Sequence, residues 1–255
     1  MRPRIAIPVP HSTDREYSER AMPQYERAVA LAGGDPVRIP LDEDRGQAKA
    51  LIESCVGVLL PGSKADVDPR RFGQTKSPHT ANADLKREAI DDILLEDAYS
   101  HRKPVLGICY GLQSLNVFRG GSLIQHIPDF LPDFHPEEKR TRVNHEAGKT
   151  VAVAHSVEVD GGSKLFGVAT SDGPTDKTRN PLLVPVNSSH HQSADAAGKG
   201  LRIVARCDED GVVEALEGTA PDHFVLAVQW HPERSVEDPV SRNIFRALVD
   251  AAGGR

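Results

Sequence analysis

The sequence predicts an α/β protein with a mainly parallel central sheet, helices on both faces, and an additional strand-rich portion in the second half. Short apolar runs alternate with helical patterns through the first half, which is typical of a parallel sheet. Strand-like runs then follow one another in the second half. The chain has 255 residues, of which 38% are hydrophobic. We expect residues 1–255 to form a single domain with one sizeable core.

The first half contains four strand-like runs, each with a helical pattern after it. The first three runs are RIAIPVP, PVRIP and VGVLLPGS. Their helical patterns cover about 19–31, interrupted by Pro23, about 44–54 and about 82–102. The fourth run, Val105 to Ile108, precedes a helical pattern that Gly120 and Gly121 end.

The second half contains further strand-like runs and a terminal helix. The runs are TVAVAHSVEV, LRIVARC, VVEALEG and FVLAVQW, with a turn predicted at CDEDG. DPVSRNIFRALVDAAGG predicts a capped helix. Residues 166–185 are polar and rich in Gly and Pro, and we expect an irregular excursion there. A surface loop and a substrate lid are both open interpretations of that excursion.

Composition excludes several classes of function. The net charge is −6, and without a basic block neither nucleic acid nor an anionic membrane is an expected partner. No apolar run reaches the ~18 residues of a membrane span, and the amino terminus lacks the features of a signal peptide. Three distant cysteines fit a reducing cytoplasm. The oligomeric state is open, with a homodimer among the alternatives.

The stretch PVLGICYGLQSLN places Cys109 between the fourth strand and its helix. Gly107 and Gly111 leave room for a tight turn and for a ligand. The first N–H groups of the helix lack internal partners and favour a thiolate at this corner. The pattern therefore predicts a nucleophilic cysteine, with an inert buried cysteine as the alternative.

A nucleophilic cysteine needs a base and a group that orients the base. In VLAVQWHPERS, His231 follows an apolar strand and Glu233 lies two residues later. Residues i and i+2 of an extended chain project to the same side, so the carboxylate can hold one imidazole nitrogen and leave the other for the thiol. Pro232 stiffens the link. A surface turn after an edge strand is the alternative.

Four motifs together resemble a known family. GICYGLQ with a downstream HPE is similar to class I glutamine amidotransferase domains, which have a flavodoxin-like fold and a Cys-His-Glu triad. More closely, the chain resembles the gamma-glutamyl-gamma-aminobutyrate hydrolase family, also called peptidase C26. The motifs, which run in the family's order from 59 to 233, are LLPGSKADVDPRRFG, GICYGLQSLNVFRGGSLIQHI, VNSSHHQ and AVQWHPE.

The resemblance implies roles for individual residues. Cys109 matches the nucleophile, His231 the base and Glu233 its orienting acid, while the amides of Gly62 and Tyr110 match the donors of the oxyanion hole. Positions that hold the glutamyl head group match Gln113, His190, His191 and Gln192, for each of which a structural role is the alternative. The chain departs from many relatives in having Ser63 in place of a second glycine and Tyr110 in place of arginine.

The resemblance implies a cysteine hydrolase that cleaves a small γ-glutamyl amide through a glutamyl thioester and releases glutamate. The leaving amine is open. One alternative is a glutaminase subunit that supplies ammonia to a separate synthase, although Leu112 stands where such subunits often have histidine. A catalytically silent binding protein is disfavoured by the intact triad. We expect no metal or cofactor, and we assign four carboxylates without metal-ligand spacing to solvent or turns: Asp66, Asp68, Glu137 and Glu138.

Overall fold

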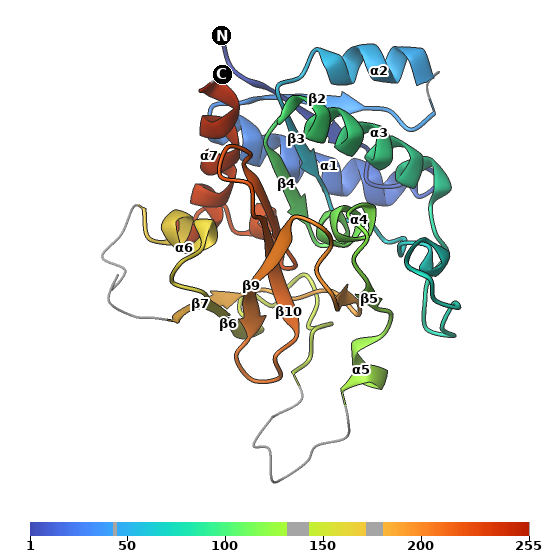
Figure 1. The fold of residues 1–255 in the computed structure, drawn as a ribbon, viewed down its shortest axis with the longest axis vertical. Helices are drawn as coiled ribbons and strands as arrows, with labels where there is room; N and C mark the ends of the chain where they lie inside the picture. Colours follow the sequence, from blue (N-terminus) through green and yellow to red (C-terminus); the bar gives the residue numbers. More distant parts are fainter. Residues whose placement is uncertain (43–44, 132–142, 172–180, 255) are drawn as a thin grey trace.

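A nine-stranded sheet runs through the protein, with helices on both of its faces (Figure 1). The computed structural model describes residues 1–42, 45–131, 143–171 and 181–254. The sheet has the order β2-β1-β3-β4-β11-β10-β9-β6-β7. Its strands in chain order are β1 (Arg4–Pro8), β2 (Asp35–Ile39), β3 (Gly57–Leu60), β4 (Val105–Ile108), β6 (His155–Val159), β7 (Leu182–Val186), β9 (Leu201–Cys207), β10 (Val213–Gly218) and β11 (Val225–Val228). The short strands β5 (Leu123–Ile124) and β8 (Ser193–Ala194) form a separate pair.

The strand directions confirm the predicted fold class. Strands β2, β1, β3, β4 and β11 are parallel. Strands β10, β9, β6 and β7 continue the same sheet in antiparallel fashion. The strands β3, β4 and β11 are buried along their whole length, as expected of strands that are covered on both faces. The predicted strand TVAVAHSVEV is shorter than expected, because regular pairing begins only at His155.

The helices divide between the two faces of the sheet. They are α1 (Arg15–Leu31), α2 (Arg45–Glu53), α3 (Leu85–His101), α4 (Tyr110–Phe118), α5 (Ile127–Phe130), α6 (Lys164–Ala169) and α7 (Pro239–Gly253), with single 3₁₀ turns at η1 (Pro69–Phe72) and η2 (Pro232–Arg234). One apolar core joins α1, α6 and α7 to the sheet, and a second joins α2, α3 and α4 to the opposite face. Helix α1 continues through Pro23 and begins at the Asp14 cap, earlier than predicted.

Three loops meet where the central parallel strands end. Strand β4 lies between β3 and β11 in the sheet, and all three run in the same direction. Their carboxyl ends lead directly into Pro61, Cys109 and the segment that carries His231. Parallel α/β sheets bind ligands beyond the carboxyl ends of their strands. The topology therefore brings together segments that lie 48 to 170 positions apart in the chain.

Both ends of the predicted excursion at 166–185 have regular secondary structure. Helix α6 covers its first residues and strand β7 covers its last ones. Residues 172–180 lie outside the described residues, and so do Glu137 and Glu138. Within the described part of the chain, no helix combines the length and apolar character needed to cross a membrane.

Candidate active site

Cys109 occupies a strained corner between β4 and α4. Its backbone has φ 53° and ψ −108°, one of only two positive φ values among the described residues other than glycine. Such a conformation costs about 1–3 kcal/mol in a residue with a side chain. The flanking glycines are required by space: a Cβ on Gly107 would lie 2.8 Å from the Gly111 carbonyl oxygen, and one on Gly111 would lie 2.1 Å from that of Leu60. The predicted turn at this cysteine is confirmed.

His231 and Glu233 form the predicted pair. The Nδ1 of His231 lies 2.7 Å from Oε1 of Glu233, and both side chains are buried. Burial opposes the charged imidazole, but Glu233 and the hydrogen-bonded Cys109 outweigh it and raise the pKa of His231 to about 9. Burial likewise opposes the charged carboxylate, yet His231 holds the pKa of Glu233 below its ordinary value. The pair therefore holds a proton next to Cys109 at neutral pH.

Asn187 fixes the backbone of His231, a role that the sequence analysis missed. The His231 N–H donates to Oδ1 of Asn187 at 3.0 Å, and Nδ2 of Asn187 donates to the His231 carbonyl at 2.9 Å. Asn187 follows β7 and is buried. It is the asparagine of the VNSSHHQ motif, so the motif marked the segment without indicating this contact.

The predicted oxyanion role of Gly62 is not supported by its hydrogen bond. The Gly62 N–H donates to the Tyr25 hydroxyl at 3.1 Å, in the interior of the protein. The next residue, Ser63, lines the cavity that contains Cys109. A Cβ on Gly62 would lie 3.1 Å from Cε1 of His231, so glycine is needed there for close packing against the base. Tyr110 is the first residue of α4, and its amide has no partner within the helix.

A buried arginine contacts both the loop after β3 and the helix that follows Cys109. Arg87 donates to the Pro61 carbonyl at 2.7 Å and to Asp91 at 2.7 Å, and its guanidinium lies 4.9 Å from the centre of the Tyr110 ring. Asp91 in turn accepts from Ser114 of α4 at 2.9 Å. Arg87 thus ties the loop after β3 to the helix after Cys109. Its position in the long amphipathic helix α3 gave no indication of this role.

A cavity of about 210 Å³ gathers the predicted site residues. Those that line it are Cys109, Tyr110, Gln113, His190, His191, Gln192 and His231. The side-chain amide of Gln113 donates to the Gln192 carbonyl at 3.3 Å, while Nδ1 of His190 faces that same carbonyl at 2.9 Å. These bonds give Gln113 and His190 a structural role in addition to their place at the cavity.

The assignment of Asp66 to solvent or a turn is wrong. Asp66 is buried and lines the cavity. Its Oδ1 atom lies 3.1 Å from Nε2 of His191. This hydrogen bond raises the pKa of His191. Asp68, by contrast, does occupy a turn, where it caps η1 and pairs with Arg70.

Cationic groups also line the cavity. Lys64, Lys149 and Arg234 all contribute to its lining. Lys64 is paired with Asp14 at 2.6 Å. Burial, together with Arg234 and other neighbouring cations, lowers the pKa of Lys149. Nη1 of Arg234 is buried without a hydrogen-bond partner in the described part of the chain. The cavity therefore also offers positive charge to an anionic group.

The chain is similar in sequence to known proteins. The peptidase C26 family model matches residues 6–233. The chain is 32% identical to the gamma-glutamyl-gamma-aminobutyrate hydrolase PuuD of Escherichia coli K12, over 89% of this chain and 84% of that protein. It is 37% identical to a candidate glutamine amidotransferase of Mycobacterium tuberculosis, over 90% of this chain and 67% of that protein. It is 31% identical to a glutamine amidotransferase-like protein of Rickettsia prowazekii, over 89% and 87% of the two chains.

Solved structures show the same fold at lower sequence identity. A candidate GMP synthase subunit from Thermoplasma acidophilum superimposes with a TM-score of 0.64 at 17% identity, covering 100% of this chain and 96% of that one. The glutaminase domain of Trypanosoma brucei CTPS, solved with bound acivicin, gives a TM-score of 0.61 at 18% identity, covering 99% and 94%. These similarities support the α/β fold described above.

Proposed function

Because the chain belongs to the peptidase C26 family of glutamine amidotransferase-like proteins, we propose that it is a cysteine hydrolase that cleaves the γ-glutamyl amide bond of small γ-glutamyl amines. One observation carries the proposal. Cys109 stands at a strained corner and lines a cavity with His231, whose ring Glu233 holds at 2.7 Å. A thiol, a base and an oriented carboxylate in this order are the requirements of nucleophilic acyl transfer.

The proposed reaction proceeds in two halves. The Cys109 thiolate attacks the γ-carbonyl carbon, a C–S bond forms, and the carbonyl oxygen becomes an oxyanion. His231 then gives its proton to the leaving nitrogen, the C–N bond breaks, and a γ-glutamyl thioester remains. A water molecule gives a proton to His231 and attacks the thioester, and cleavage of the C–S bond releases glutamate and restores the thiolate. Glu233 stabilises the imidazolium throughout.

The amides of Tyr110 and Ser63 are the oxyanion donors that we propose. Each such donor stabilises the developing negative charge by roughly 3 kcal/mol. Tyr110 supplies the first amide of α4. Ser63 is favoured over Gly62 because Ser63 lines the cavity, whereas the Gly62 amide donates to Tyr25.

The distribution of charge in the cavity suits a γ-glutamyl head group. Such a group carries an α-ammonium and an α-carboxylate. Asp66 offers a buried carboxylate to the ammonium, and Lys149 and Arg234 offer positive charge to the carboxylate. A carboxylate has about four lone-pair sites, so Asp66 can accept from a substrate while it remains bonded to His191.

A substrate panel tests the proposal. Purified chain is incubated with γ-glutamyl amides of small amines, including γ-glutamyl-γ-aminobutyrate because the relative from E. coli is named for it, and released glutamate is measured. We expect at least one of these amides to be hydrolysed faster than glutamine, with no activity in Cys109→Ala. The proposal fails if the isolated chain hydrolyses none of them while a co-purifying synthase activates glutamine hydrolysis.

The proposed recognition of the α-ammonium group can be tested with the same set of substrates. Glutaryl amides lack the α-ammonium, so wild-type enzyme should prefer a γ-glutamyl amide over the matching glutaryl amide. In Asp66→Asn this preference should fall by about tenfold, because a desolvated ion pair is lost. Lys64→Met is the matched control, since Lys64 is already paired with Asp14, and it should keep the preference.

A further inference from the structure

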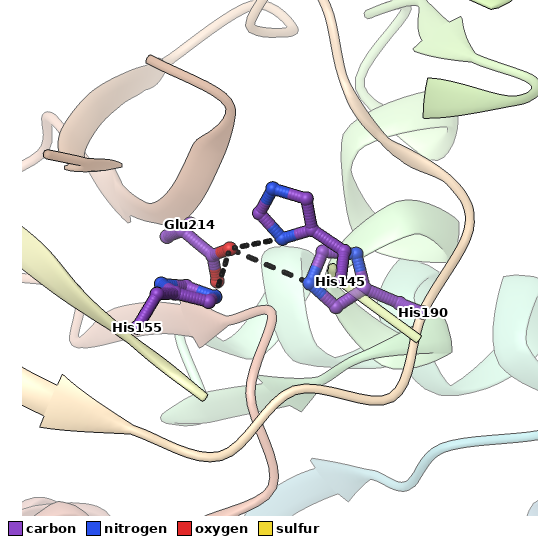
Figure 2. A group of neighbouring side chains, drawn as sticks. All are labelled: His145, His155, His190 and Glu214. Atoms are coloured by element: carbon purple, nitrogen blue, oxygen red, sulfur yellow. Dashed lines mark ion pairs between the residues drawn. The ribbon is translucent and has the colours of Figure 1, made fainter. Parts of the chain in front are cut away.

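A second cluster of ionisable side chains lies outside the catalytic group. Three histidine rings from separate segments turn toward one carboxylate (Figure 2). Oε1 of Glu214 lies 3.3 Å from Nδ1 of His145, 3.3 Å from Nε2 of His155 and 3.4 Å from Nε2 of His190. None of the four residues is more than 5% exposed. These four atoms all lie within 4.8 Å of one another, so the side chains converge on one point.

The far side of each ring determines which nitrogen carries the proton. The other nitrogen of each ring faces an oxygen that can only accept a hydrogen bond. These oxygens belong to the Asp210 carboxylate, 2.9 Å from His145, the Ser156 carbonyl, 3.2 Å from His155, and the Gln192 carbonyl, 2.9 Å from His190. A neutral imidazole has one donor nitrogen and one acceptor nitrogen. In their neutral forms all three rings therefore point a lone pair at the Glu214 carboxylate.

Four inward-facing acceptors require positive charge between them, and protons or a metal ion could supply it. Protons compete with a metal ion here: although burial opposes charge on the rings, Asp210 and Glu214 raise the pKa of His145 to about 9, and Cys207 and Glu214 raise the pKa of His155 to about 10. Protonated rings would, however, draw close to the carboxylate, because charge-assisted N–H···O bonds are about 2.7–2.9 Å long. Two contacts in this protein have such N···O distances: 2.7 Å between His231 and Glu233, and 2.9 Å between His145 and Asp210.

The distances within the cluster match metal ligation instead. The three inward nitrogens and both Glu214 oxygens have no hydrogen-bond partner within the described ranges. Zn–N and Zn–O bonds of about 2.0–2.1 Å at a tetrahedral angle place each nitrogen about 3.3 Å from the oxygen. The observed separations are 3.3 to 3.4 Å.

We propose that His145, His155, His190 and Glu214 bind one divalent transition-metal ion, for which Zn²⁺ is the best match. Nitrogen and carboxylate ligands are those that Zn²⁺ takes, and four protein ligands make a closed, structural site. The carboxylate or carbonyl behind each ring is the outer contact that ligating histidines nearly always make. The ligands come from four separate segments without local spacing, which is why the sequence indicated no metal.

The ion would stabilise the wall of the catalytic cavity. His190 lines that cavity and is also one of the four ligands. Its segment, which follows β7, also contains Asn187, which holds the backbone of His231. The metal thus has a positioning role, and no step of the proposed reaction passes through it.

Metal uptake tests the site without any measurement of activity. Full-length protein is stripped with a chelator, dialysed, and titrated with Zn²⁺ or Co²⁺, with metal per chain measured by elemental analysis. We expect one ion per chain, a higher melting temperature with metal, and visible Co²⁺ bands typical of four-coordination by nitrogen and oxygen. Asp210→Asn keeps all four ligands but replaces the charged partner of His145 with a neutral amide, and should weaken binding by about 10–100-fold. Glu214→Gln should weaken it further.

Two control variants address the rival clusters. Cys207 lies near His145 and Asp210, and an exposed group contains His79, His126 and Asp129. Cys207→Ser and His126→Asn should both keep one tightly bound ion per chain. The proposal is overturned if wild-type protein takes up no stoichiometric ion, if Co²⁺ shows a thiolate charge-transfer band, or if either control variant loses the ion. Because the stoichiometry and the Co²⁺ spectrum are measured on wild-type protein, they decide the matter even if Glu214→Gln fails to fold.

Discussion

His231 and Asn187 hold each other through two hydrogen bonds, one in each direction between a backbone and a side chain. The bonds are 3.0 Å and 2.9 Å long, and both residues are buried. The imidazole is therefore fixed from two sides, by Glu233 through its ring and by Asn187 through its backbone. A base placed in this way keeps one orientation toward Cys109, which is what proximity effects in catalysis require.

Asn187→Ala should lower kcat with little change in KM. The substitution leaves the His231 N–H without a partner and leaves its carbonyl with only the Arg234 N–H, at 3.3 Å. An unpaired buried donor costs about 1–3 kcal/mol, and the loss of its partner displaces the base. We expect a loss of about 10–100-fold in kcat, measured by steady-state kinetics. Asn187→Asp can accept from the His231 N–H but cannot donate to its carbonyl, and should fall in between. An unchanged kcat in Asn187→Ala would show that η2 alone positions His231.

Tyr25→Phe tests which amide stabilises the oxyanion. The tyrosine hydroxyl accepts from the Gly62 N–H, and its removal frees that amide. If Ser63 and Tyr110 are the donors, the loss of this anchor loosens the loop, and kcat/KM should fall by about three- to tenfold, the effect of one ordinary hydrogen bond. Equal or higher kcat/KM would instead indicate that the Gly62 amide turns to the substrate. The melting temperature of the variant serves as the control for folding.

Cys109 should be the only cysteine that iodoacetamide labels rapidly in folded protein. Cys109 is 7% exposed and lines the cavity. Cys55 and Cys207 are 1% and 2% exposed, and burial raises the pKa of both thiols. Mass spectrometry after a brief pulse at neutral pH measures the labelling, with Cys109→Ser as the control. Faster labelling of Cys55 or Cys207 would contradict the assignment of the nucleophile.

Glu233→Gln should reduce turnover less than His231→Ala, because an amide can still hold the ring but stabilises the imidazolium poorly. Glu233 helps to raise the pKa of His231 from 6.5 to about 9. The alkaline limb of the kcat/KM profile should therefore lie near pH 9 in wild-type enzyme and move to lower pH in the variant. Full activity in Glu233→Gln would assign the orienting role to another carboxylate.

The raised pKa of His231 also has a consequence for the stability of the fold. A raised pKa in the folded state means that the stabilisation from protonated His231 is complete below pH 6.5 and is lost as the pH rises through about 9. The free energy of unfolding of the wild type should therefore decrease over this range more steeply than that of Glu233→Gln. Chemical denaturation at several pH values measures the difference, and parallel curves for the two proteins would contradict the assigned pKa.

The proposed catalytic group was predictable because its members are marked by short local patterns in the sequence. Glycines flank Cys109, and Glu233 stands two residues from His231, so short-range geometry sufficed to predict both the corner and the pair. Asp66 gave no comparable indication, since its partner His191 lies 125 positions away. The same holds for Tyr25, whose contact with Gly62 spans 37 positions and occupies the amide that was predicted to be an oxyanion donor.

By itself, the sequence determined the alternation of strands and helices, the parallel core of the sheet and the strained corner at Cys109, because hydrophobic periodicity and glycine placement act over a few residues. Only the tertiary structure decided which side chains meet across segments. The pairing of β4 with both β3 and β11 brings Ser63, Cys109 and His231 to one cavity. Folding of the antiparallel strands against the 143–148 and 187–192 segments brings three histidines onto Glu214. Such contacts depend on the register of distant strands, which no local pattern encodes.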